Sequence, residues 1–328
     1  SRNPFDTPTE DRNIVFGSCN GLICLLKHPS IVFWNPSTRK HYDLPVTEYE
    51  LAVKPCNQVQ YVCYGFGYDD VNDDYKLLHI SQFYNEVRNK VKIYSLKSDS
   101  WRRLDDCRLR FAAHERAPSC HGVFVDCSVH WLVSDKDGLG IVYIFGFHLG
   151  TEKFHGVPHP RFPDKNCLVN VGKLGGKLCL HCIYDMSHID IWAMNTYGVK
   201  ESWTKQFSVA IIVDISRFEF PTPVTYSKDG KQVLWQVLLG GKLFCYDLQQ
   251  RTFEDACIRN IPEICMAFLS VESLVKLPHA ANTGLIKNKR NSRRGMICWQ
   301  RNSNWCFSQL NKKLVCNCGN LMGLMANL

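Results

Sequence analysis

The side chains that could carry chemistry in this chain form incomplete sets. Cys179-Leu-His-Cys182 has the spacing of half a zinc site, and His188 follows shortly after it. A structural zinc ion needs four ligands, and the sequence contains no second Cys-x-x-Cys pair. On a β-strand, Cys179 and Cys182 would also point to opposite faces. We therefore expect these two cysteines to be core thiols, with no metal bound.

Other motifs are incomplete as well. The acidic run from Asp69 to Asp74 is similar to a calcium loop, but it lacks the glycine at the sixth position and the glutamate at the twelfth, so a solvated hairpin turn is the better interpretation. The chain has no phosphate-binding glycine loop, no Gly-x-Ser-x-Gly and no His-Glu-x-x-His. Four cysteines near the C-terminus lack zinc-finger spacing: Cys298, Cys306, Cys316 and Cys318. We predict a non-catalytic protein without cofactor or metal.

Composition narrows the class of protein further. The 328 residues are 45% hydrophobic, enough for a large core, and the net charge is +8. Residues 279–328 contain eight Lys or Arg and no Asp or Glu, so residues 1–278 are electroneutral. A neutral body cannot use the phosphate-neutralising interaction that dominates nucleic-acid binding. The longest apolar stretches, Ile141 to Phe147 and Val209 to Val213, are far shorter than the roughly 20 residues that span a membrane.

Cysteine usage indicates a cellular compartment. Many of the 17 cysteines lie inside apolar, strand-like runs, where a thiol behaves as a small hydrophobic side chain; examples are Cys24, Cys63, Cys179 and Cys245. The chain is also too long for a small disulfide-framed domain. Reduced thiols predict a cytoplasmic or nuclear protein.

The elements that would position any site are β-strands. Short β-branched and aromatic runs closed by turn residues fill the chain, and the helical period is almost absent. Several runs are apolar on both faces, as expected for strands between neighbouring sheets; they include Val123 to Val125, Val129 to Val133 and Val233 to Leu238.

A unit of about fifty residues recurs five times. In each unit a third strand ends in a polar turn, and the outer strand that follows contains a ring that we expect in the core: Tyr42, Trp101, Phe154, Trp203 and Phe253. The steps between these rings, 59, 53, 49 and 50 residues, are close to the period of kelch-type blades. Ile264 to Leu277 would add one or two strands that complete a composite blade with N-terminal residues. The prediction is an all-β, kelch-like β-propeller of five or six four-stranded blades.

The lengths of the connections distinguish the two faces of such a ring. Turns between first and second strands are short, whereas the connections after second and fourth strands include long ones: Val46 to Gln60, Ser81 to Asn89, Asp105 to Ser119, Pro158 to Asn166 and Val209 to Pro223. Several of the long connections combine Phe, Tyr and Arg, which are enriched at binding hot spots. The candidate partner-binding residues are Phe83, Tyr84, Arg88, Arg161, Phe162, Arg217 and Phe218.

Specific motifs in order along the chain resemble the F-box-associated domain of plant F-box/kelch-repeat proteins. They are Gly17-Ser-Cys-Asn-Gly-Leu-Ile-Cys24, Trp34-Asn-Pro-Ser-Thr38, Tyr64-Gly-Phe-Gly-Tyr-Asp69 with Asp74-Tyr75-Lys76, Val91 to Trp101, His121-Gly122 with His130-Trp131, Asp190 to Met194 with Val199 to Lys205, and Val271 to Val275. The resemblance covers about residues 13–277. Within the family it is greatest to members that restrain plant immune receptors and to S-locus F-box proteins.

The resemblance implies a function. The domain would capture a target protein for ubiquitination while an N-terminal F-box binds the Skp1-like adaptor of a cullin ligase. No F-box precedes Ser1 in this sequence, so we expect the chain as given not to bind the adaptor. The implied division is a linker (1–12), an F-box-associated propeller (13–278) and a basic, cysteine-containing tail outside the fold (279–328).

Two other functions remain open from the sequence. A stand-alone kelch-like scaffold would share the propeller, and only upstream sequence would distinguish it. A propeller enzyme of the galactose-oxidase or glycosidase kind would need metal ligands or paired carboxylates at the central channel, and no such set is evident in the sequence. Neither a membrane nor a nucleic acid is expected as a partner.

Overall fold

The structure of the chain is a computed structural model. It describes residues 14–27, 30–45, 59–83, 88–111, 121–134, 142–160, 167–184, 187–211, 221–237, 242–256, 265–278, 312–318 and 323–327. Strands dominate these residues, and their one helical turn is the 3₁₀ turn η1 (Lys200–Ser202). No helix among them is long and apolar enough to cross a membrane. The all-β prediction is confirmed.

Six antiparallel sheets, blades 1 to 6, follow one another along the chain. Blade 1 consists of β1 (Ile14–Cys19), β2 (Leu22–Lys27), β3 (Ser30–Asn35) and β4 (Lys40–Asp43). Blade 2 consists of β5 (Val59–Asp69), β6 (Asp74–Phe83), β7 (Lys90–Ser95) and β8 (Ser100–Arg103). Blade 3 consists of β10 (Val123–Val125), β11 (Ser128–Ser134), β12 (Val142–His148) and β13 (Lys153–Val157), with β9 (Arg110–Phe111) paired to β11.

The second half of the chain repeats the pattern. Blade 4 consists of β14 (Cys167–Leu174), β15 (Lys177–Tyr184), β16 (His188–Met194) and β17 (Trp203–Ala210). Blade 5 consists of β18 (Thr222–Tyr226), β19 (Gln232–Val237), β20 (Lys242–Asp247) and β21 (Phe253–Asp255). Blade 6 has three strands, β22 (Cys265–Val271), β23 (Lys312–Cys318) and β24 (Gly323–Asn327).

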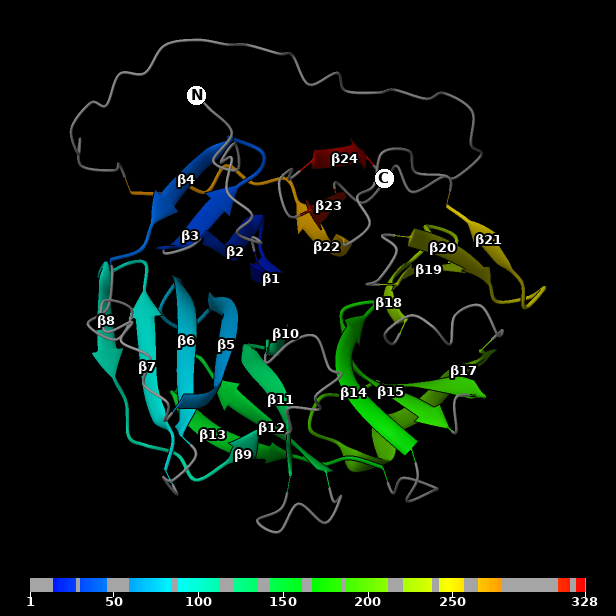
Figure 1. Cartoon of the computed structure of the whole chain (residues 1–328), viewed down its shortest axis with the longest axis horizontal. Helices are drawn as coiled ribbons and strands as arrows, with labels where there is room; N and C mark the ends of the chain where they lie inside the picture. Colours follow the sequence, from blue (N-terminus) through cyan, green and yellow to red (C-terminus); the bar gives the residue numbers. More distant parts are fainter. Residues whose placement is uncertain are drawn as a thin grey trace.

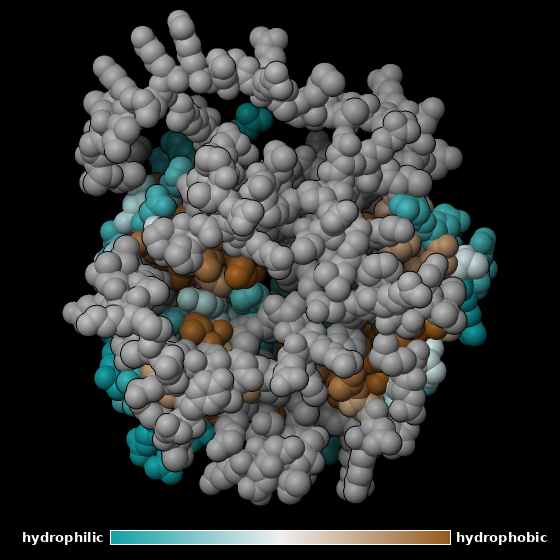
Figure 2. Space-filling view, in the orientation of Figure 1, coloured by the Kyte–Doolittle hydropathy of each residue, from teal (hydrophilic) through white to brown (hydrophobic). Residues whose placement is uncertain are grey.

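The blades form a closed ring, as a propeller requires. Their first strands contact one another in the order β1, β5, β10, β14, β18 and β22, and β22 contacts β1. Figure 1 shows the six sheets around a common centre, with the sixth beside the first. In Figure 2, described apolar side chains lie within the disc and polar ones along its rim. The β-propeller prediction is confirmed, with five four-stranded blades and a smaller sixth sheet.

The sixth sheet differs from the predicted composite blade. Its first strand, β22, pairs with β23 and not with N-terminal residues. The reason is that β1 already belongs to a complete four-stranded sheet, so the described N-terminal residues leave no strand to donate. Two strands of the region predicted to be a separate tail, β23 and β24, pair next to β22. The domain boundaries at residues 12 and 278 stay predictions.

The recurrent ring lies near the start of the fourth strand in every four-stranded blade, although its distance from the preceding turn differs: in blades 2, 3 and 5 it lies two residues after the positive-φ turn residue, and in blade 1 it lies three residues after it. Each one lies directly across from a large side chain on the third strand, in the pairs Phe33–Tyr42, Tyr94–Trp101, Phe147–Phe154, Met194–Trp203 and Tyr246–Phe253. Trp203 is buried, whereas the other four rings are half-buried and pack against the core clusters. The predicted repeat is therefore confirmed, but the outer strands leave most of these rings partly open to solvent.

The glycines of β5 let blade 3 pack closely against blade 2. A Cβ atom at Gly65 would lie 2.6 Å from the Trp131 ring, and one at Gly67 would lie 2.3 Å from Phe124. The residue between them, Phe66, points the other way, into the core shared by blades 1 and 2. The Tyr-Gly-Phe-Gly-Tyr motif thus presents large side chains to one neighbouring blade and backbone to the other.

Candidate protein-interaction surface

The connections divide the ring into two faces. First and second strands are joined by short turns, including Asn20-Gly21, Asp126-Cys127 and Gly175-Gly176. The connections after second and fourth strands lie at the opposite ends of the strands, because neighbouring strands are antiparallel. Four links join the five four-stranded blades: residues 44–58, 104–122 (which contain β9), 158–166 and 211–221. The face with these connections is the candidate surface.

Two of the seven predicted partner-binding residues lie within the described ranges. Phe83 ends β6 and is buried, with 7% of its surface exposed, and the Lys90 ammonium lies 4.5 Å from the centre of its ring. Arg88 is exposed and lies just before β7, so it flanks the same connection. The other five fall outside the described ranges: Tyr84, Arg161, Phe162, Arg217 and Phe218.

A buried asparagine that the sequence interpretation missed fixes this end of blade 2. The Asn89 backbone exchanges two hydrogen bonds with Cys107, of 2.7 and 3.1 Å, and its side-chain amide donates to the Leu109 carbonyl. Asn89 is 2% exposed. These hydrogen bonds join the connection that follows β8 to the connection between β6 and β7. They fix the backbone of Asn89, the residue next to Arg88.

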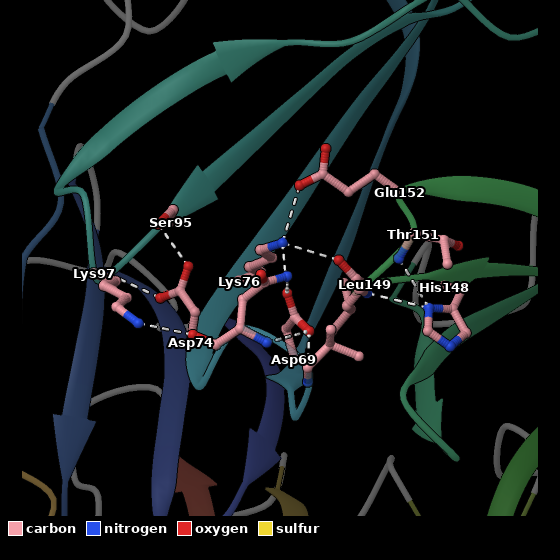
Figure 3. A network of polar contacts seen from close by, with 12 residues as sticks. Asp69, Asp74, Lys76, Ser95, Lys97, His148, Leu149, Thr151 and Glu152 are labelled. Carbon is pink, nitrogen blue, oxygen red and sulfur yellow. Dashed lines mark hydrogen bonds and ion pairs between the residues drawn. The ribbon is translucent and has the colours of Figure 1, made fainter.

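On the short-turn face, the acidic hairpin differs from the prediction of a solvated turn. The turn between β5 and β6 is confirmed, but Asp69 is fully buried and Asp74 is 5% exposed. The Lys76 ammonium lies 2.7 Å from Asp69 Oδ2 and 2.9 Å from Glu152 Oε1, and it donates to the Leu149 carbonyl at 2.9 Å. Figure 3 shows Lys76 between these partners, which come from blades 2 and 3.

The charges in this network stabilise one another. Burial raises the pKa of Asp69, but the hydrogen bonds from Lys76 and Asn72 outweigh it, so the pKa lies below its ordinary value of 3.8. Burial lowers the pKa of Lys76, and the Asp69 and Glu152 carboxylates raise it to above its ordinary value. Arg102 also pairs with Glu152, and the pKa of Glu152 is lowered despite its burial. The network is an ionic link between blades, with all three Lys76 donors used.

A second polar cluster joins blades 3 and 4. The Tyr197 hydroxyl lies 2.7 Å from His130 Nε2 and 3.0 Å from His155 Nε2, and His130 Nδ1 lies 2.9 Å from the Val123 carbonyl. A carbonyl only accepts, so His130 Nδ1 carries its proton and His130 Nε2 accepts from Tyr197. Burial lowers the pKa of His130 to about 4, which keeps this ring neutral.

Of the residues near the possible half zinc site, Cys179, His181 and Cys182 are core residues, whereas His188 is partly exposed. Cys179 and Cys182 are buried in different hydrophobic clusters, so their predicted orientation to opposite faces is confirmed. Burial raises the pKa of each thiol to about 12 and lowers that of His181 to about 4. Among the described residues, no group of three or more His, Cys, Asp or Glu side chains is placed to hold a metal ion.

A cavity of about 870 Å³ opens between blade 2 and the C-terminal strap, residues 272–278, which follows β22. Its walls include Tyr68, Tyr75 and Lys97 from blade 2 and Glu272 and Val275 from the strap. The Asn35 amide donates to the strap carbonyls of Ser273 and Val275, both at 3.0 Å. These contacts hold the strap against blade 1.

The closed ring of blades and the aromatic residue that recurs on each fourth strand define the chain as a β-propeller domain. The family of F-box associated beta propeller domains has a model that matches residues 3–260. The chain belongs to this family, as its motifs predicted. The match ends before β22, whereas the motif resemblance extended to residue 277.

Similar proteins come from Arabidopsis thaliana. F-box protein CPR1 is 36% identical over 290 residues, which cover 82% of this chain and 68% of that protein. F-box protein At4g22390 is 30% identical over 259 residues, which cover 74% of this chain and 64% of that protein. F-box/kelch-repeat protein At3g23880 is 27% identical, and the match covers 62% of this chain and 54% of that protein. The chain thus spans roughly half to two thirds of the length of these relatives.

Proposed function

We propose that this domain is the target-binding part of an SCF-type E3 ubiquitin ligase. The observation that carries the proposal is the family match over residues 3–260, together with relatives that are named F-box proteins over most of this chain's length. A protein target binds to the propeller, and the chain itself makes and breaks no covalent bond.

The mechanism is proximity. An F-box, outside the sequence described here, binds a Skp1-like adaptor, and the propeller holds the target beside the ubiquitin-loaded enzyme. Tethering raises the effective concentration of target lysines at that enzyme. A rigid receptor suits this role, since the ring is closed and its blades are linked by the Lys76 and Tyr197 networks.

The target would bind the face that carries the long connections. Preorganised side chains lose less entropy on binding, and Asn89 fixes the backbone beside Arg88. We assign to this surface Tyr84, Arg88, Arg161, Phe162, Arg217 and Phe218, and we assign buried Phe83 a supporting position beneath it. We further propose that the protein acts in the cytoplasm or the nucleus, which is compatible with its buried thiols.

Affinity capture from plant tissue tests this function. The bait is the full-length protein with its F-box, beside a double variant, Tyr84→Ala with Arg88→Ala. The control carries Lys200→Ala and Lys228→Ala, at exposed sites on the short-turn face. We expect the wild type and the control to capture the adaptor and a target that becomes ubiquitinated, and the test variant to retain the adaptor and lose the target.

Two results would contradict the proposal. Capture of a partner without any adaptor would favour the stand-alone scaffold. Equal capture of the target by the two variants would show that the assigned surface does not bind the target.

A further inference from the structure

The strap has the alternation of a β-strand but no neighbouring strand. It continues β22 directly, and the ladder between β22 and β23 stops at Val271, where the strap begins. Along the strap, exposed residues alternate with inward-facing ones. The Asn35 amide binds the carbonyls of Ser273 and Val275, and carbonyls two residues apart point to the same side in an extended chain. The strap is therefore an extended strand outside any ladder.

One edge of the strap is hydrogen-bonded, and the other edge is open. The bonded edge faces blade 1, where Asn35 binds two strap carbonyls and the Ser37 hydroxyl accepts from the Ser273 amide at 3.2 Å. The backbone groups of Leu274 and Lys276 point to the opposite edge, because their direction alternates along a strand. Among the described residues, no hydrogen bond involves the backbone of either one. The open edge therefore presents their amide donors and carbonyl acceptors unpaired.

The cavity of about 870 Å³ lies along the open edge of the strap. The strap forms one wall, and the turns of blade 2 form the other wall with Asp73 and Lys97. Asn35 and Ser37, which hold the bonded edge, do not line the cavity. Its volume is within the range of known ligand sites. Apolar groups line it from both walls: Tyr68, Tyr75, Leu96, Val275, Leu277 and Pro278.

The two walls also carry the most exposed large hydrophobic side chains among the described residues. Leu274 on the strap is 86% exposed, and Val71, on the blade 2 turn that contains Asp73, is 72% exposed. Apolar side chains in water are stabilised when a partner covers them, and exposed apolar surface beside a groove is typical of an interaction site. The open backbone edge and this apolar surface lie on the same face of the propeller, the short-turn face.

We propose that the strap binds an extended, apolar segment of a partner protein by strand addition. The backbone of the segment pairs with the open edge of the strap, and its alternate side chains enter the cavity. An unpaired strand edge recognises an extended chain, whereas a helix has already used its backbone groups internally. The site lies on the face opposite the assigned target surface, so the inference goes beyond the proposed function.

Selection of short random peptides displayed on phage tests the inference, with the full chain as bait. We expect the enriched peptides to share apolar side chains at alternate positions, because only one face of an added strand contacts the cavity. One enriched peptide, labelled with a fluorophore, is then the probe for measurements of affinity.

Two variants of one strap residue separate the backbone from the side chain. Leu274→Pro removes an amide from the open edge, where proline fits an extended chain, and we expect the affinity for the peptide to fall about tenfold. Leu274→Ala keeps the amide and removes only the side chain, so we expect a loss of at most about threefold. Similar losses for the two variants would show that the backbone edge does not bind the peptide.

Methylation of the peptide backbone gives a test that leaves the protein unchanged. In an added strand, alternate amides point to the strap and the others point away from it. Methyl groups on the first set should lower the affinity by more than about tenfold, and methyl groups on the second set should leave it within about twofold. Equal effects of the two sets would exclude strand addition, even if Leu274→Pro fails to fold.

Other results would also overturn the inference. They are enrichment of no peptide, enrichment of peptides without the alternation, and a dimer of the wild type that Leu274→Pro abolishes, which would assign the open edge to a second copy of the chain.

The proposed function is tested separately. Tyr84→Ala with Arg88→Ala should leave the affinity for the peptide unchanged, and Leu274→Pro in the full-length protein should retain the adaptor and the target. Loss of the target in Leu274→Pro would overturn the assignment of the strap to a further partner. If the wild type captures no target from plant tissue but binds the peptide, the receptor function fails and the strap inference stands.

Discussion

At the scale of single residues, Lys76 shows how a short sequence motif acquires a structural role. The motif places Asp69, Asp74 and Lys76 around one hairpin, and the fold brings Glu152 and the Leu149 carbonyl from blade 3 to the same ammonium group. The desolvation cost of a buried charge is offset only when its partners are complete. Removing the Lys76 ammonium should therefore destabilise the folded domain much more than removing an exposed charge would.

We predict that Lys76→Met destabilises the domain by about 3–5 kcal/mol at neutral pH, because Asp69 would remain charged and buried without its partner. Urea unfolding followed by tryptophan fluorescence measures the change. Lys228→Met, at an exposed lysine, should alter stability by less than about 0.5 kcal/mol. Equal unfolding midpoints for wild type and Lys76→Met would show that the link contributes nothing.

The same network predicts an acid dependence. The pKa values of Asp69 and Glu152 lie below their ordinary 3.8 and 4.5, so the folded state binds fewer protons than the unfolded state in acid. Their stabilisation is present above about pH 4.5 and is lost as the pH falls through the folded values. Without Lys76, burial would raise the pKa of Asp69, so the stability gap between wild type and Lys76→Met should narrow from pH 7 to pH 4. A constant gap across this range would exclude Asp69 as the cause.

The sequence predicted these residues only in part. Its local pattern identified the Asp69–Asp74 turn, and motif resemblance singled out Lys76. It could not predict burial of Asp69 or the pairing with Glu152, since the two carboxylates are 83 positions apart in the chain. The same limit applies to Asn89, whose partners Cys107 and Leu109 follow an intervening strand pair.

At the scale of elements, a tryptophan on the outer strand of blades 2 and 4 forms a hydrogen bond that links its blade to the previous one. Trp101 Nε1 donates to the Pro45 carbonyl at 3.0 Å, and Trp203 Nε1 donates to the Pro158 carbonyl at 2.8 Å. Each proline follows the outer strand of the preceding blade. Blades 3 and 5 have phenylalanine at this position, which packs without a donor.

We predict that Trp203→Ala costs about 3–5 kcal/mol, as expected for loss of a buried aromatic ring. Trp101→Ala should cost less because its ring is half-buried. Trp203→Phe keeps an aromatic ring but removes the donor of the hydrogen bond to Pro158. We expect this change to lower the free energy of unfolding by about 1 kcal/mol. Thermal and chemical unfolding of the three variants provide the measurement, and a greater loss for Trp101→Ala than for Trp203→Ala would contradict this ranking.

The glycines of β5 allow a sharper comparison. Gly67→Ala would place a methyl group against the Phe124 ring, so we expect a loss of about 1–3 kcal/mol from overpacking. Gly156→Ala has no atom within 4 Å of the new methyl group and should be neutral or stabilising by up to about 1 kcal/mol. Both changes add one methyl group to a strand, so similar unfolding free energies for the two variants would mean that close blade packing is not what Gly67 provides.

At the scale of the whole molecule, the repeat was predictable because each blade carries its own copy of the same ring and turn. Closure of the ring was not predictable in the same way, because it depends on β22 and the strap, and this segment is not repeated along the chain. β22 and the strap provide it: the Ser18 hydroxyl donates to the Leu269 carbonyl at 2.5 Å, and Asn35 binds two strap carbonyls. The sequence placed Ile264 to Leu277 at the closing position but paired it with the wrong neighbour.

Two leucines three residues apart in the strap test this closure. Leu277 is 8% exposed and packs in the core of blades 1 and 2, whereas Leu274 is 86% exposed. We predict that Leu277→Ala costs about 2–5 kcal/mol and that Leu274→Ala changes stability by less than about 0.5 kcal/mol. Because the strap holds blade 6 against blade 1, hydrogen exchange in Leu277→Ala should accelerate first in β1 and β22, before β15 in blade 4. Uniform acceleration around the ring would mean that the propeller unfolds as one unit and that the strap is no more critical than any other buried segment.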